Sequence, residues 1–587
     1  MSRCGACRGW TPGPCPAVVP SGPVGGACGD RRPVGAGRPV RVPPSSRPDR
    51  WEVRAVTAVP VSPGATPGVP APGGPDGQPT VLVAGGGIAG TAAALALADA
   101  GVRVVLAEAR PRLGGLAFSF RRSSPAGDLT ADNGQHVHLR CCTAYRALLD
   151  RVGGAPLAPV QDRLDVPVLD ARDHTLGRLR RSALPAPLHL AGSLARYPHL
   201  SLAERSAAAR AALALRRLDP ADPALDGARF GDWLRHHGQS PRAVEALWDL
   251  VGTATLNARA DQVSLALAAM VFRTGLLGEA GAADIGRARV PLGELHDVRA
   301  RRALDRAGVR TLLRTRLRRL RPPGAAPEPG PPDTSTGTSR GTSPDRAADG
   351  SGTGHGGWRA DLDGPGGTPT VLRAHAVVLA VPPEEAERLL PDGALERPAR
   401  LRGLGTAPIV NLHVVYDRRV LRRPFLAALG TPVQWVFDRT EPSGLTGGAQ
   451  YLALSQSAAG DIIDQPAADL RARFLPELAR LLPAARPARV LDFFVTRERA
   501  ATFAPAPGTA RLRPHAISRA PGLLLAGAWT DTGWPATMEG AARSGATAAA
   551  AALRHLGAAR GRADPPPAPT AVDPGRRPGH TQEGTAV

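Results

Sequence analysis

Three observations in this 587-residue sequence predict an α/β protein in which a nucleotide-binding domain is interleaved with an α+β domain. An apolar, β-branched run at 80–84 leads through a glycine-rich turn into a helix of small residues. A second strand-to-helix pattern of the same kind stands more than 430 residues further on, at 523–553. Between them, Leu/Ala-rich stretches at 200–217 and 243–277 predict a helical middle.

The basic residues of the chain are all arginine, and this excludes several chemistries. Lysine and arginine together number 73, against 51 acidic residues, for a formal charge of +22. Because none of the 73 is lysine, the chain has no Schiff-base former, P-loop phosphate ligand or catalytic base of that type. The composition is typical of a coding bias, and aromatics make up only 4 %, so we expect no nucleic-acid partner.

Composition also predicts the domain boundaries. Two terminal stretches and one insertion are rich in Pro and Gly and cannot bury enough apolar surface to offset their ordering entropy. We expect disordered ends at 1–78 and 558–587, and a low-complexity insertion at 322–357. We expect the nucleotide-binding domain at 79–150, 301–321, 358–395 and 501–557, a mostly helical substrate-binding region at 151–300, and a strand-rich part of it at 396–500.

Cysteine usage and targeting signals indicate a reducing compartment. Cys4 and Cys7 form a C-x-x-C pair, but no second pair or His follows at zinc-ligand spacing, so we expect no metal site. Cys141 and Cys142 are adjacent, and we expect both to be reduced. No apolar run predicts a signal peptide or a membrane span. We therefore expect a cytoplasmic protein, and peripheral docking at the inner face of the cytoplasmic membrane stays open.

The first folded segment carries a dinucleotide fingerprint. Its glycines stand in G-x-G-x-x-G register between the strand 80–84 and a helix at 91–100. The first permits a tight turn, the second allows a pyrophosphate to approach, and the third lets the helix pack on the strand. A second strand, 102–107, ends at Glu108, whose carboxylate can accept the hydroxyls of an adenosine ribose. We assign Gly85, Gly87, Ile88, Ala89 and Gly90 to this Rossmann-type site.

The segment from Glu108 onward resembles a flavoprotein superfamily. Its letters, EARPRLGG, are similar to the E-x-R-x-x-x-G-G extension of the amine oxidase and phytoene desaturase superfamily. The resemblance implies bound FAD and the two-domain fold shared by amine oxidases and GDI-like proteins. It assigns to the diphosphate and the approach to the flavin Ala109, Arg110, Gly114, Gly115 and Leu116, the last standing where many amine oxidases carry an arginine.

A motif near the end of the chain resembles the closing motif of the same superfamily. Residues 523–526 read as a strand and 535–553 as a helix. The letters GAWTDTGWPATMEGA follow the strand and run into the first turns of the helix. A strand that leads through a glycine into a helix N-terminus favours anion or carbonyl binding. The resemblance makes cofactor neighbours of Gly527, Asp531, Met538 and Glu539. No cysteine stands near this motif in the sequence, so we expect the FAD to be bound non-covalently.

Two intermediate segments fit this arrangement. Residues 308–320 read as a strand pair that alternates Arg with Leu, and the resemblance implies that Leu317 meets the adenine through its backbone. Residues 375–391 read as a buried strand, a Pro-Pro turn and a helix with Glu384 and Glu385 in its first turn.

The segment ADNGQHVH, 131–138, is unusually polar. If its residues alternate faces, Asp132, His136 and His138 share one side. Together with WTDTGWPATMEGA, it closely resembles the hydroxysqualene dehydroxylase family. The missing lysine argues against the amine oxidase branch, whose members commonly keep a lysine near flavin N5.

The family reaction replaces the allylic hydroxyl of hydroxysqualene with hydride from reduced FAD, giving squalene and water in hopanoid biosynthesis. The chemistry needs a proton donor and a dry apolar cavity. We expect the catalytic donor to be Asp132 or His136, with Asp531 third. Implied partners are a hydrophobic C30 isoprenoid, under a cap at about 180–295, and squalene-synthase-like enzymes of the same pathway. Two alternatives stay open: a carotenoid desaturase or isomerase, and a non-catalytic prenyl-binding protein.

Overall fold

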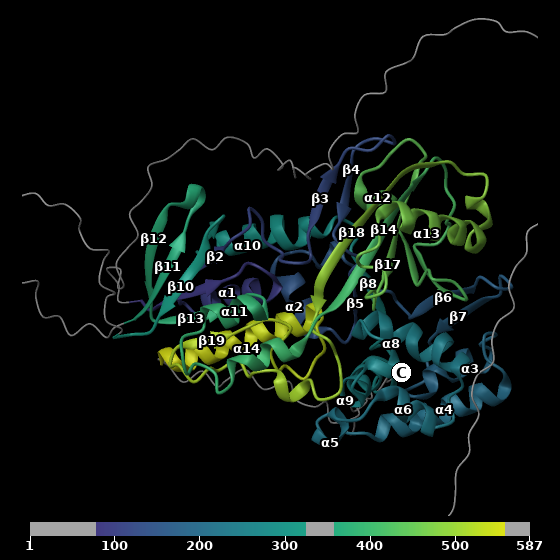
Figure 1. Ribbon diagram of the computed structural model, residues 1–587, viewed down its shortest axis with the longest axis horizontal. Helices are drawn as coiled ribbons and strands as arrows, with labels where there is room; N and C mark the ends of the chain where they lie inside the picture. Colours follow the sequence, from purple (N-terminus) through teal and green to yellow (C-terminus); the bar gives the residue numbers. More distant parts are fainter. Residues whose placement is uncertain (1–77, 325–356, 558–587) are drawn as a thin grey trace, which may run out of the picture. The chain divides into compact units, whose positions relative to one another are not determined.

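A computed structural model describes residues 78–324 and 357–557 (Figure 1). The predicted extension at 1–78, the insertion at 322–357 and the tail at 558–587 lie outside the described residues, apart from their edge positions. Within the two described ranges, no helix is both long and apolar enough to cross a membrane.

A five-stranded parallel sheet draws on segments from both ends of the folded chain. Its order is β19-β13-β1-β2-β9, and the neighbouring strands all run parallel. β1 and β13 are buried along their whole length, because helices cover both faces of such a sheet. The predicted α/β class is confirmed. The strands are β1 (Thr80–Ala84), β2 (Arg103–Glu108), β9 (Arg310–Leu313), β13 (Ala376–Leu379) and β19 (Leu523–Leu525).

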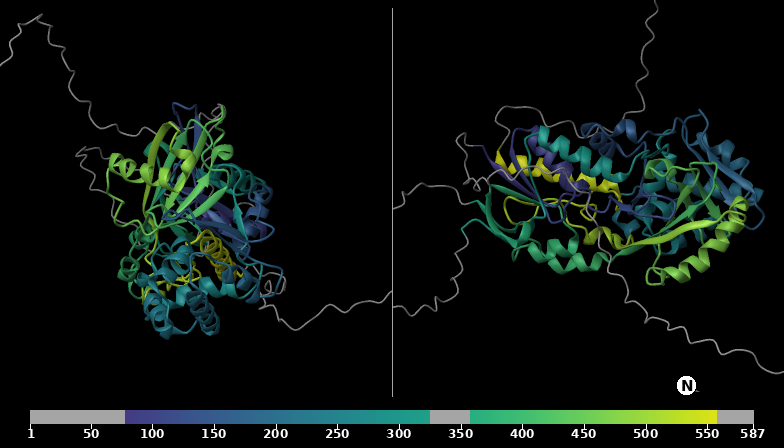
Figure 2. Two further views of the ribbon diagram at one scale, coloured as in Figure 1. Left: turned by 90° about the vertical axis from the view of Figure 1, so that its right-hand side faces the viewer. Right: turned by 90° about the horizontal axis from the view of Figure 1, so that it is seen from above.

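Two helices of small residues bring the two predicted motifs together. α1 (Ile88–Asp99) and α14 (Met538–Leu556) lie side by side (Figure 2). A Cβ on Gly545 would lie 2.1 Å from the carbonyl oxygen of Ala89, so the backbones are in contact at this point. The chain segments that precede the two helices, one from each end of the sequence, are thereby held at one edge of the sheet.

The predicted strand pair at 308–320 is wrong in its pairing. β9 joins the parallel sheet beside β2, whereas β10 (Arg316–Arg321) joins an antiparallel sheet with β11 (Trp358–Asp363) and β12 (Pro369–Ala374). Arg314 between them has a φ of 53°, a left-handed conformation that turns the chain from one sheet into the other. A bulge after Leu317 breaks the alternation, so that Leu317 and Leu320 are both buried.

A seven-stranded, mainly antiparallel sheet has the order β18-β14-β17-β16-β15-β6-β7. One face is covered by α13 (Ala467–Leu481) through Leu470, Phe474 and Leu478. The other face meets a helical region along Val168, Phe425 and Phe437. The strands are β6 (Asp165–Asp170), β7 (Leu176–Arg180), β14 (Ala407–Tyr416), β15 (Phe425–Leu429), β16 (Trp435–Asp438), β17 (Gln450–Gln456) and β18 (Val490–Thr502).

The middle of the chain is helical, as its Leu/Ala-rich pattern predicts. It comprises α3 (Ala191–Ala195), α4 (Leu202–Arg217), α5 (Pro223–Asp226), α6 (Phe230–His236), α7 (Pro241–Ala243), α8 (Asp249–Leu256) and α9 (Leu265–Phe272), after the short 3-10 turn η2 (Leu188–Leu190). The remaining named elements are β3 (Ser119–Arg122), β4 (Leu129–Asp132), β5 (Val137–Leu139), β8 (Ile285–Arg287), α2 (Thr143–Arg151), α10 (Ala300–Arg306), α11 (Pro383–Leu389) and α12 (Thr440–Ser443).

The expectation of one alternating face through 131–138 is wrong. β4 ends at Asp132, the chain bends, and β5 begins at Val137 and pairs with β8 instead of β3. The bend arises because the carbonyl of Asn133 turns to side chains of the large sheet, accepting hydrogen bonds from Asn411 and Thr496. The polar residues of this segment therefore belong to two different sheets and the loop between them.

Candidate active site

The three fingerprint glycines are needed for different reasons. Gly85 has a φ of +105°, and a Cβ there would lie 2.2 Å from the carbonyl oxygen of Ala380, which follows β13. A Cβ on Gly90 would lie 1.8 Å from the Gly85 carbonyl oxygen. Gly87 has an ordinary φ of −72°, and the one heavy atom near its Cβ position is Gly115 Cα, at 3.8 Å. The fold does not itself require a glycine at 87, whereas the close approach of a ligand does.

The N-terminus of α1 opens onto this loop without a cap. Gly87 is the N-cap residue, so no side chain accepts from the first-turn N–H groups, and the first turn holds no acidic residue. Such a terminus binds anions such as a diphosphate. Glu108, at the end of β2, lies against the same loop: its carboxylate accepts from the N–H of Gly86 at 2.6 Å and of Arg110 at 2.7 Å.

The glycine pair Gly114–Gly115 lies against the fingerprint loop. A Cβ on Gly115 would come within 3.1 Å of Gly87 Cα, so both residues of this contact lack a side chain. Arg112, which the sequence did not single out, donates to the Gly115 carbonyl at 2.9 Å and covers the ring of Phe118 at 3.5 Å. Burial lowers the pKa of Arg112 to about 10, so its guanidinium stays charged at neutral pH.

Arg112 contacts the glycine pair directly, while the assignment of Arg110 to the diphosphate stays a prediction. The predicted neighbours Ala109, Arg110 and Leu116 are exposed beside this pair, Leu116 by 44 %. The signal was in the sequence, because Arg112 is the second arginine of EARPRLGG and stands two residues before the pair. Spacing alone could not choose between two arginines of one short segment.

The turn after β19 is built by neighbours on both sides. Gly527 has a φ of +144°, and its N–H donates to Ser544 Oγ of α14 at 2.8 Å. A Cβ on Gly527 would lie 2.4 Å from Trp529 Nε1, which donates to the carbonyl of Val381 at 2.9 Å. This glycine is therefore required by packing, and its turn is tied to both α14 and the segment after β13.

The other predicted residues of the closing motif have very different surroundings. Asp531 is exposed, and its carboxylate accepts from the N–H of Gly533 at 3.3 Å. Glu539 is buried and caps α2, accepting from the N–H of Tyr145 at 2.8 Å and pairing with Arg543 at 2.5 Å. Its carboxylate is thus committed to the protein.

Met538 joins an apolar cluster with Trp534. Cys141 and Cys142 belong to the same cluster, so folding brings two thiols near a motif that lies almost 400 residues away in the sequence. Non-covalent FAD binding remains a prediction. Leu317, the predicted adenine contact, is buried in β10, and its carbonyl accepts from Arg388 at 3.3 Å.

These residues fit an FAD. The cradle between Gly87 and Gly115 has no side chain, α1 offers free N–H donors, and Arg112 supplies a positive charge beside it. When bound, FAD supplies hydride-transfer chemistry, and these groups would hold its diphosphate while Glu108 receives the ribose.

Asp132 is buried and fully engaged. Its Oδ1 accepts from Ser119 Oγ at 2.6 Å and from the N–H of Leu292 at 2.9 Å, and its Oδ2 accepts from Arg439 Nη2 at 2.7 Å. Arg439 is also buried and donates to the carbonyl of Ala288 at 2.8 Å. This ion pair ties β4 to the segment after β8 and to the end of β16.

His136 lies in the bend between β4 and β5. Its Nε2 lies 3.4 Å, and Asn411 Nδ2 3.3 Å, from the position that a Cβ on Gly134 would occupy. Burial holds the pKa of His136 below its usual 6.5; the charge of Asp132 acts to raise it and that of Arg439 to lower it. The imidazole is therefore neutral at pH 7 and is a strong acid once protonated.

Similarity to known proteins agrees with this geometry. The flavin containing amine oxidoreductase family matches residues 88–553. The chain belongs to this family. It is an FAD-dependent oxidoreductase, and the predicted cofactor and enzyme class are confirmed.

The hydroxysqualene dehydroxylase of Rhodopseudomonas palustris is 30 % identical over 80 % of this chain and 97 % of its own length. That of Zymomonas mobilis is 26 % identical over 81 % and 99 %. The predicted resemblance is confirmed.

Solved structures support the two-domain fold of this chain. A triple mutant of putrescine oxidase superposes with a TM-score of 0.58 at 19 % identity, covering 81 % of this chain and 99 % of that one. Cyclohexylamine oxidase from Brevibacterium oxydans gives 0.57 at 19 % identity, covering 82 % and 100 %. The predicted fold class is thereby confirmed.

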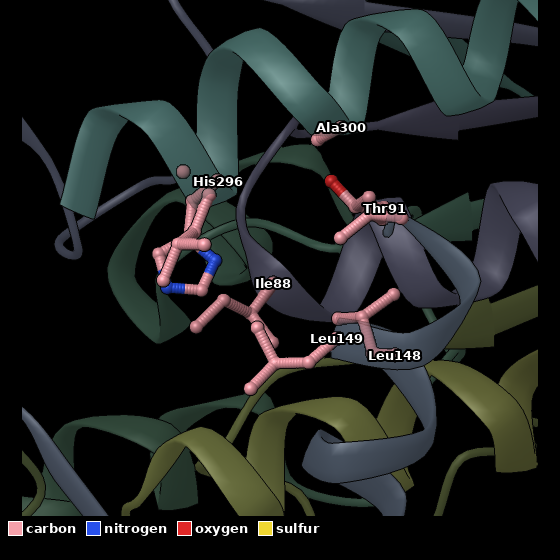
Figure 3. A pocket seen from close by; sticks show the side chains of 9 residues that line it. Ile88, Thr91, Leu148, Leu149, His296 and Ala300 are labelled. Carbon is pink, nitrogen blue, oxygen red and sulfur yellow. The ribbon is translucent and has the colours of Figure 1, made fainter. Parts of the chain in front are cut away.

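Behind the glycine pair lies a small cavity of about 10 Å³, room for one water molecule (Figure 3). Its lining includes Ile88, Thr91 and His296. The hydroxyl of Tyr145 lies 3.1 Å from Nε2 of His296, and the ring centroids of Tyr145 and His138 are 5.3 Å apart. Burial lowers the pKa of His296 to about 3 and that of His138 to about 4, so both rings are neutral. Sequence reasoning assigned no role to His296, which stands at the end of the segment AADIGRARVPLGELH, 282–296.

Proposed function

We propose that the protein reduces hydroxysqualene to squalene and water. The observation that carries this proposal is the similarity to two proteins named hydroxysqualene dehydroxylase, over at least 97 % of the length of each. The lysine-free sequence supports it, because amine oxidases commonly keep a lysine near the flavin. The polar loop at His136 also supports it, because an alcohol substrate calls for a proton donor.

The reaction balances as follows. The allylic C–O bond breaks, the hydroxyl oxygen takes a proton and leaves as water, and a hydride adds to the carbon. Reduced FAD supplies the hydride and ends oxidised, so a two-electron donor must reduce it again between turnovers. The chain has to deliver the proton, hold the hydroxyl and exclude water from the allylic cation.

Among the candidate donors, His136 is supported best. The carboxylate of Asp132 accepts three hydrogen bonds, one of them from a guanidinium, which favours a positioning role. Asp531 is exposed, and an exposed acid protonates an alcohol in an apolar cavity poorly. His136 is partly buried, and its Nε2 lies beside the backbone of Gly134 and the amide of Asn411.

We propose that the apolar chain of the substrate lies between the helical region and the large sheet, with 151–300 and 396–500 as one substrate-binding domain. Phe425, Trp435 and Phe437 support this, because they form an aromatic row on the sheet face that meets the helices. Burying each CH₂ of a C30 chain against such a face contributes about 0.8 kcal/mol.

The test is an anaerobic assay of the photoreduced holoenzyme with hydroxysqualene. We expect squalene to form in proportion to flavin oxidised, and His136→Gln to lose most of this turnover while retaining FAD. If no squalene forms, the proposal is wrong.

A carotenoid reaction is the second candidate. The carotenoid phi-ring synthase of Streptomyces griseus is 30 % identical over 83 % of this chain and 91 % of its own length. The oxidised holoenzyme should therefore also be incubated with phytoene. New double bonds in phytoene, without squalene in the first assay, would favour this candidate.

We also propose peripheral contact with an anionic lipid surface through a leucine–arginine surface on β7, η2 and α4. α3 packs against all three elements, which supports a continuous surface. Its leucines are Leu176, Leu184, Leu188, Leu202 and Leu213, exposed by 46, 52, 55, 77 and 47 %. Exposed arginines among them are Arg180, Arg196, Arg210, Arg216 and Arg217. Apolar tips flanked by arginine suit an anionic membrane.

Co-sedimentation with vesicles tests this surface. We expect binding to vesicles that contain phosphatidylglycerol, weaker binding to pure phosphatidylcholine, and a clear loss for the double variant Leu202→Glu/Leu213→Glu. Ile517→Glu is the matched control, because Ile517 is 61 % exposed but lies outside this surface. Equal loss in both variants would refute the proposed surface.

A further inference from the structure

A pair of polar side chains on the large sheet contacts the bend at Gly134. Asn411 of β14 and Thr496 of β18 are directly paired across the two strands. Both donate to the carbonyl of Asn133, Asn411 Nδ2 at 3.2 Å and Thr496 Oγ1 at 2.8 Å. That carbonyl can only accept, so the orientation of the Asn411 amide is fixed with nitrogen toward the bend.

The other end of this amide has no partner. Asn411 is 1 % exposed, and its Oδ1 is buried without any hydrogen-bond donor among the residues that the structure describes. Buried side-chain acceptors are nearly always paired, because an unpaired one has lost its bonds to water. The neighbouring Thr496 is itself held by His413 at 3.0 Å and by the Asn133 carbonyl, so it has no proton left to donate to this oxygen. The unpaired oxygen therefore calls for a donor from outside the protein.

The proton donor of the proposed reaction lies at the same spot. The Cβ position of Gly134 is 3.3 Å from Asn411 Nδ2 and 3.4 Å from His136 Nε2. The amide of Asn411 and the imidazole of His136 therefore lie close to one another on either side of the Gly134 backbone.

We propose that Asn411 recognises the hydroxyl of an isoprenoid alcohol, with its Oδ1 accepting the hydroxyl proton beside His136. This inference rests on the proposed function. A hydroxyl suits the pair because it donates to the amide oxygen and accepts from the imidazole at once. A hydrocarbon leaves Oδ1 unpaired, so the site discriminates against it. The same contact is lost when water departs, which favours release of the hydrocarbon product.

The alternative is that Asn411 serves only to hold the bend through its Nδ2. Thr496→Val separates the two roles, because it removes a donor to the same Asn133 carbonyl and leaves Oδ1 in place. Asn411→Leu removes both ends of the amide.

The experiment measures binding of hydroxysqualene and of squalene to the oxidised holoenzyme, through the change in flavin absorbance. For wild type we expect tighter binding of the alcohol. Asn411→Leu should reduce this preference by roughly 10- to 100-fold, the value of one buried hydrogen bond. Thr496→Val should retain the preference. Unchanged flavin content and melting temperature confirm that each variant is folded, and Asn411→Ser replaces Asn411→Leu if that variant fails to fold.

Two failures are distinguishable. If wild type prefers the alcohol and forms squalene but the Asn411 variant keeps the preference, this inference is wrong and the proposed function stands. The inference also falls if Thr496→Val loses the preference as much as Asn411→Leu, since the amide then only holds the bend. If wild type shows no preference and forms no squalene, the proposed function itself is wrong.

Discussion

Asp132 and His136 are four residues apart, yet their surroundings give them opposite uses. The carboxylate is fixed by Arg439 and by two further donors, whereas His136 Nε2 lies against the backbone of Gly134. An acid that must give up a proton has to be free to turn from its protein partners to the substrate. The three hydrogen bonds of Asp132 leave it no such freedom, so the residue scale favours His136 as donor and Asp132 as the anchor of its loop.

The pH dependence of turnover tests this assignment. Burial lowers the pKa of His136 below 6.5, so its protonated fraction falls about tenfold for each pH unit above that value. We expect kcat/KM to rise as pH falls from 8 toward 6. His136→Gln should lower turnover by roughly 10²-fold or more and flatten the profile. His138→Gln, two residues away, should keep the slope. A slope that survives in His136→Gln would contradict the assignment.

At this scale the sequence could predict which residue types stand in the site, but not which hydrogen-bond partners each side chain has in the folded protein. The register of the fingerprint glycines and the end position of Glu108 were readable from local spacing. The capping of α2 by Glu539 was not, because it joins residues almost 400 positions apart. Asn411 and Arg439 stand in no motif, and only the sheet register brings them to the 132–136 segment.

At the scale of elements, α1 is where the fold and the cofactor impose different demands. Gly90 is needed by the helix itself, since a Cβ there would collide with the Gly85 carbonyl at 1.8 Å. Gly87 meets no such obstacle. The two glycines of one motif should therefore fail in different ways when each receives a methyl group.

Gly87→Ala should fold normally and lose FAD. Its φ of −72° suits alanine, and the added Cβ meets only Gly115 Cα, at 3.8 Å. We expect an unchanged melting temperature for the flavin-free protein and a Kd for FAD raised by roughly 10-fold or more, from flavin titration. Gly90→Ala should instead lower the stability of the flavin-free protein. If Gly87→Ala binds FAD as wild type does, the cradle is not the diphosphate site.

The ion pair between Asp132 and Arg439 joins three elements, and its removal should be felt in stability. Removing one partner leaves an uncompensated buried charge, which costs about 3–5 kcal/mol. We expect Arg439→Met to lower the free energy of unfolding by that amount, and the double variant Arg439→Met/Asp132→Leu to cost much less than the sum of the single changes. Denaturant unfolding of all three gives the coupling. Additive effects would mean that the pair contributes nothing of its own.

The sequence predicted most elements because their signals are local. Continuous apolar runs gave β1, β13 and β19, and small-residue periodicity gave α1 and α14. Strand partners were beyond its reach: β9 and β10 are neighbours in the chain but belong to different sheets, and the reason is a single left-handed residue, Arg314. The break between β4 and β5 likewise depends on donors from β14 and β18, which no local pattern contains.

At the scale of the whole molecule, the described residues bury several neutral histidines. His138 has a pKa lowered to about 4, and His296 and His413 to about 3, in each case chiefly by burial. His296 lies beside the glycine pair, His138 in β5 and His413 in β14 of the large sheet, so they connect the stability of several parts of the fold to pH. His413 is stacked on Phe494 and bonded to Tyr451 and Thr496, which shows how completely such a ring is enclosed.

The sign of this pH dependence follows from the lowered values. In the unfolded chain these rings titrate near their usual 6.5, while in the folded protein they stay neutral until about pH 4 or 3. Between these limits unfolding takes up protons, so the stability present above pH 6.5 is lost as pH falls. Each ring should lower the free energy of unfolding by about 1.4 kcal/mol for each unit by which the pH falls in this window.

Denaturant unfolding at pH 7, 6 and 5 measures the slope. His413→Gln should reduce it by one ring, whereas His515→Gln, at a side chain 83 % exposed, should leave it unchanged. A slope that is the same in all three proteins would mean that His413 is not held neutral by the fold.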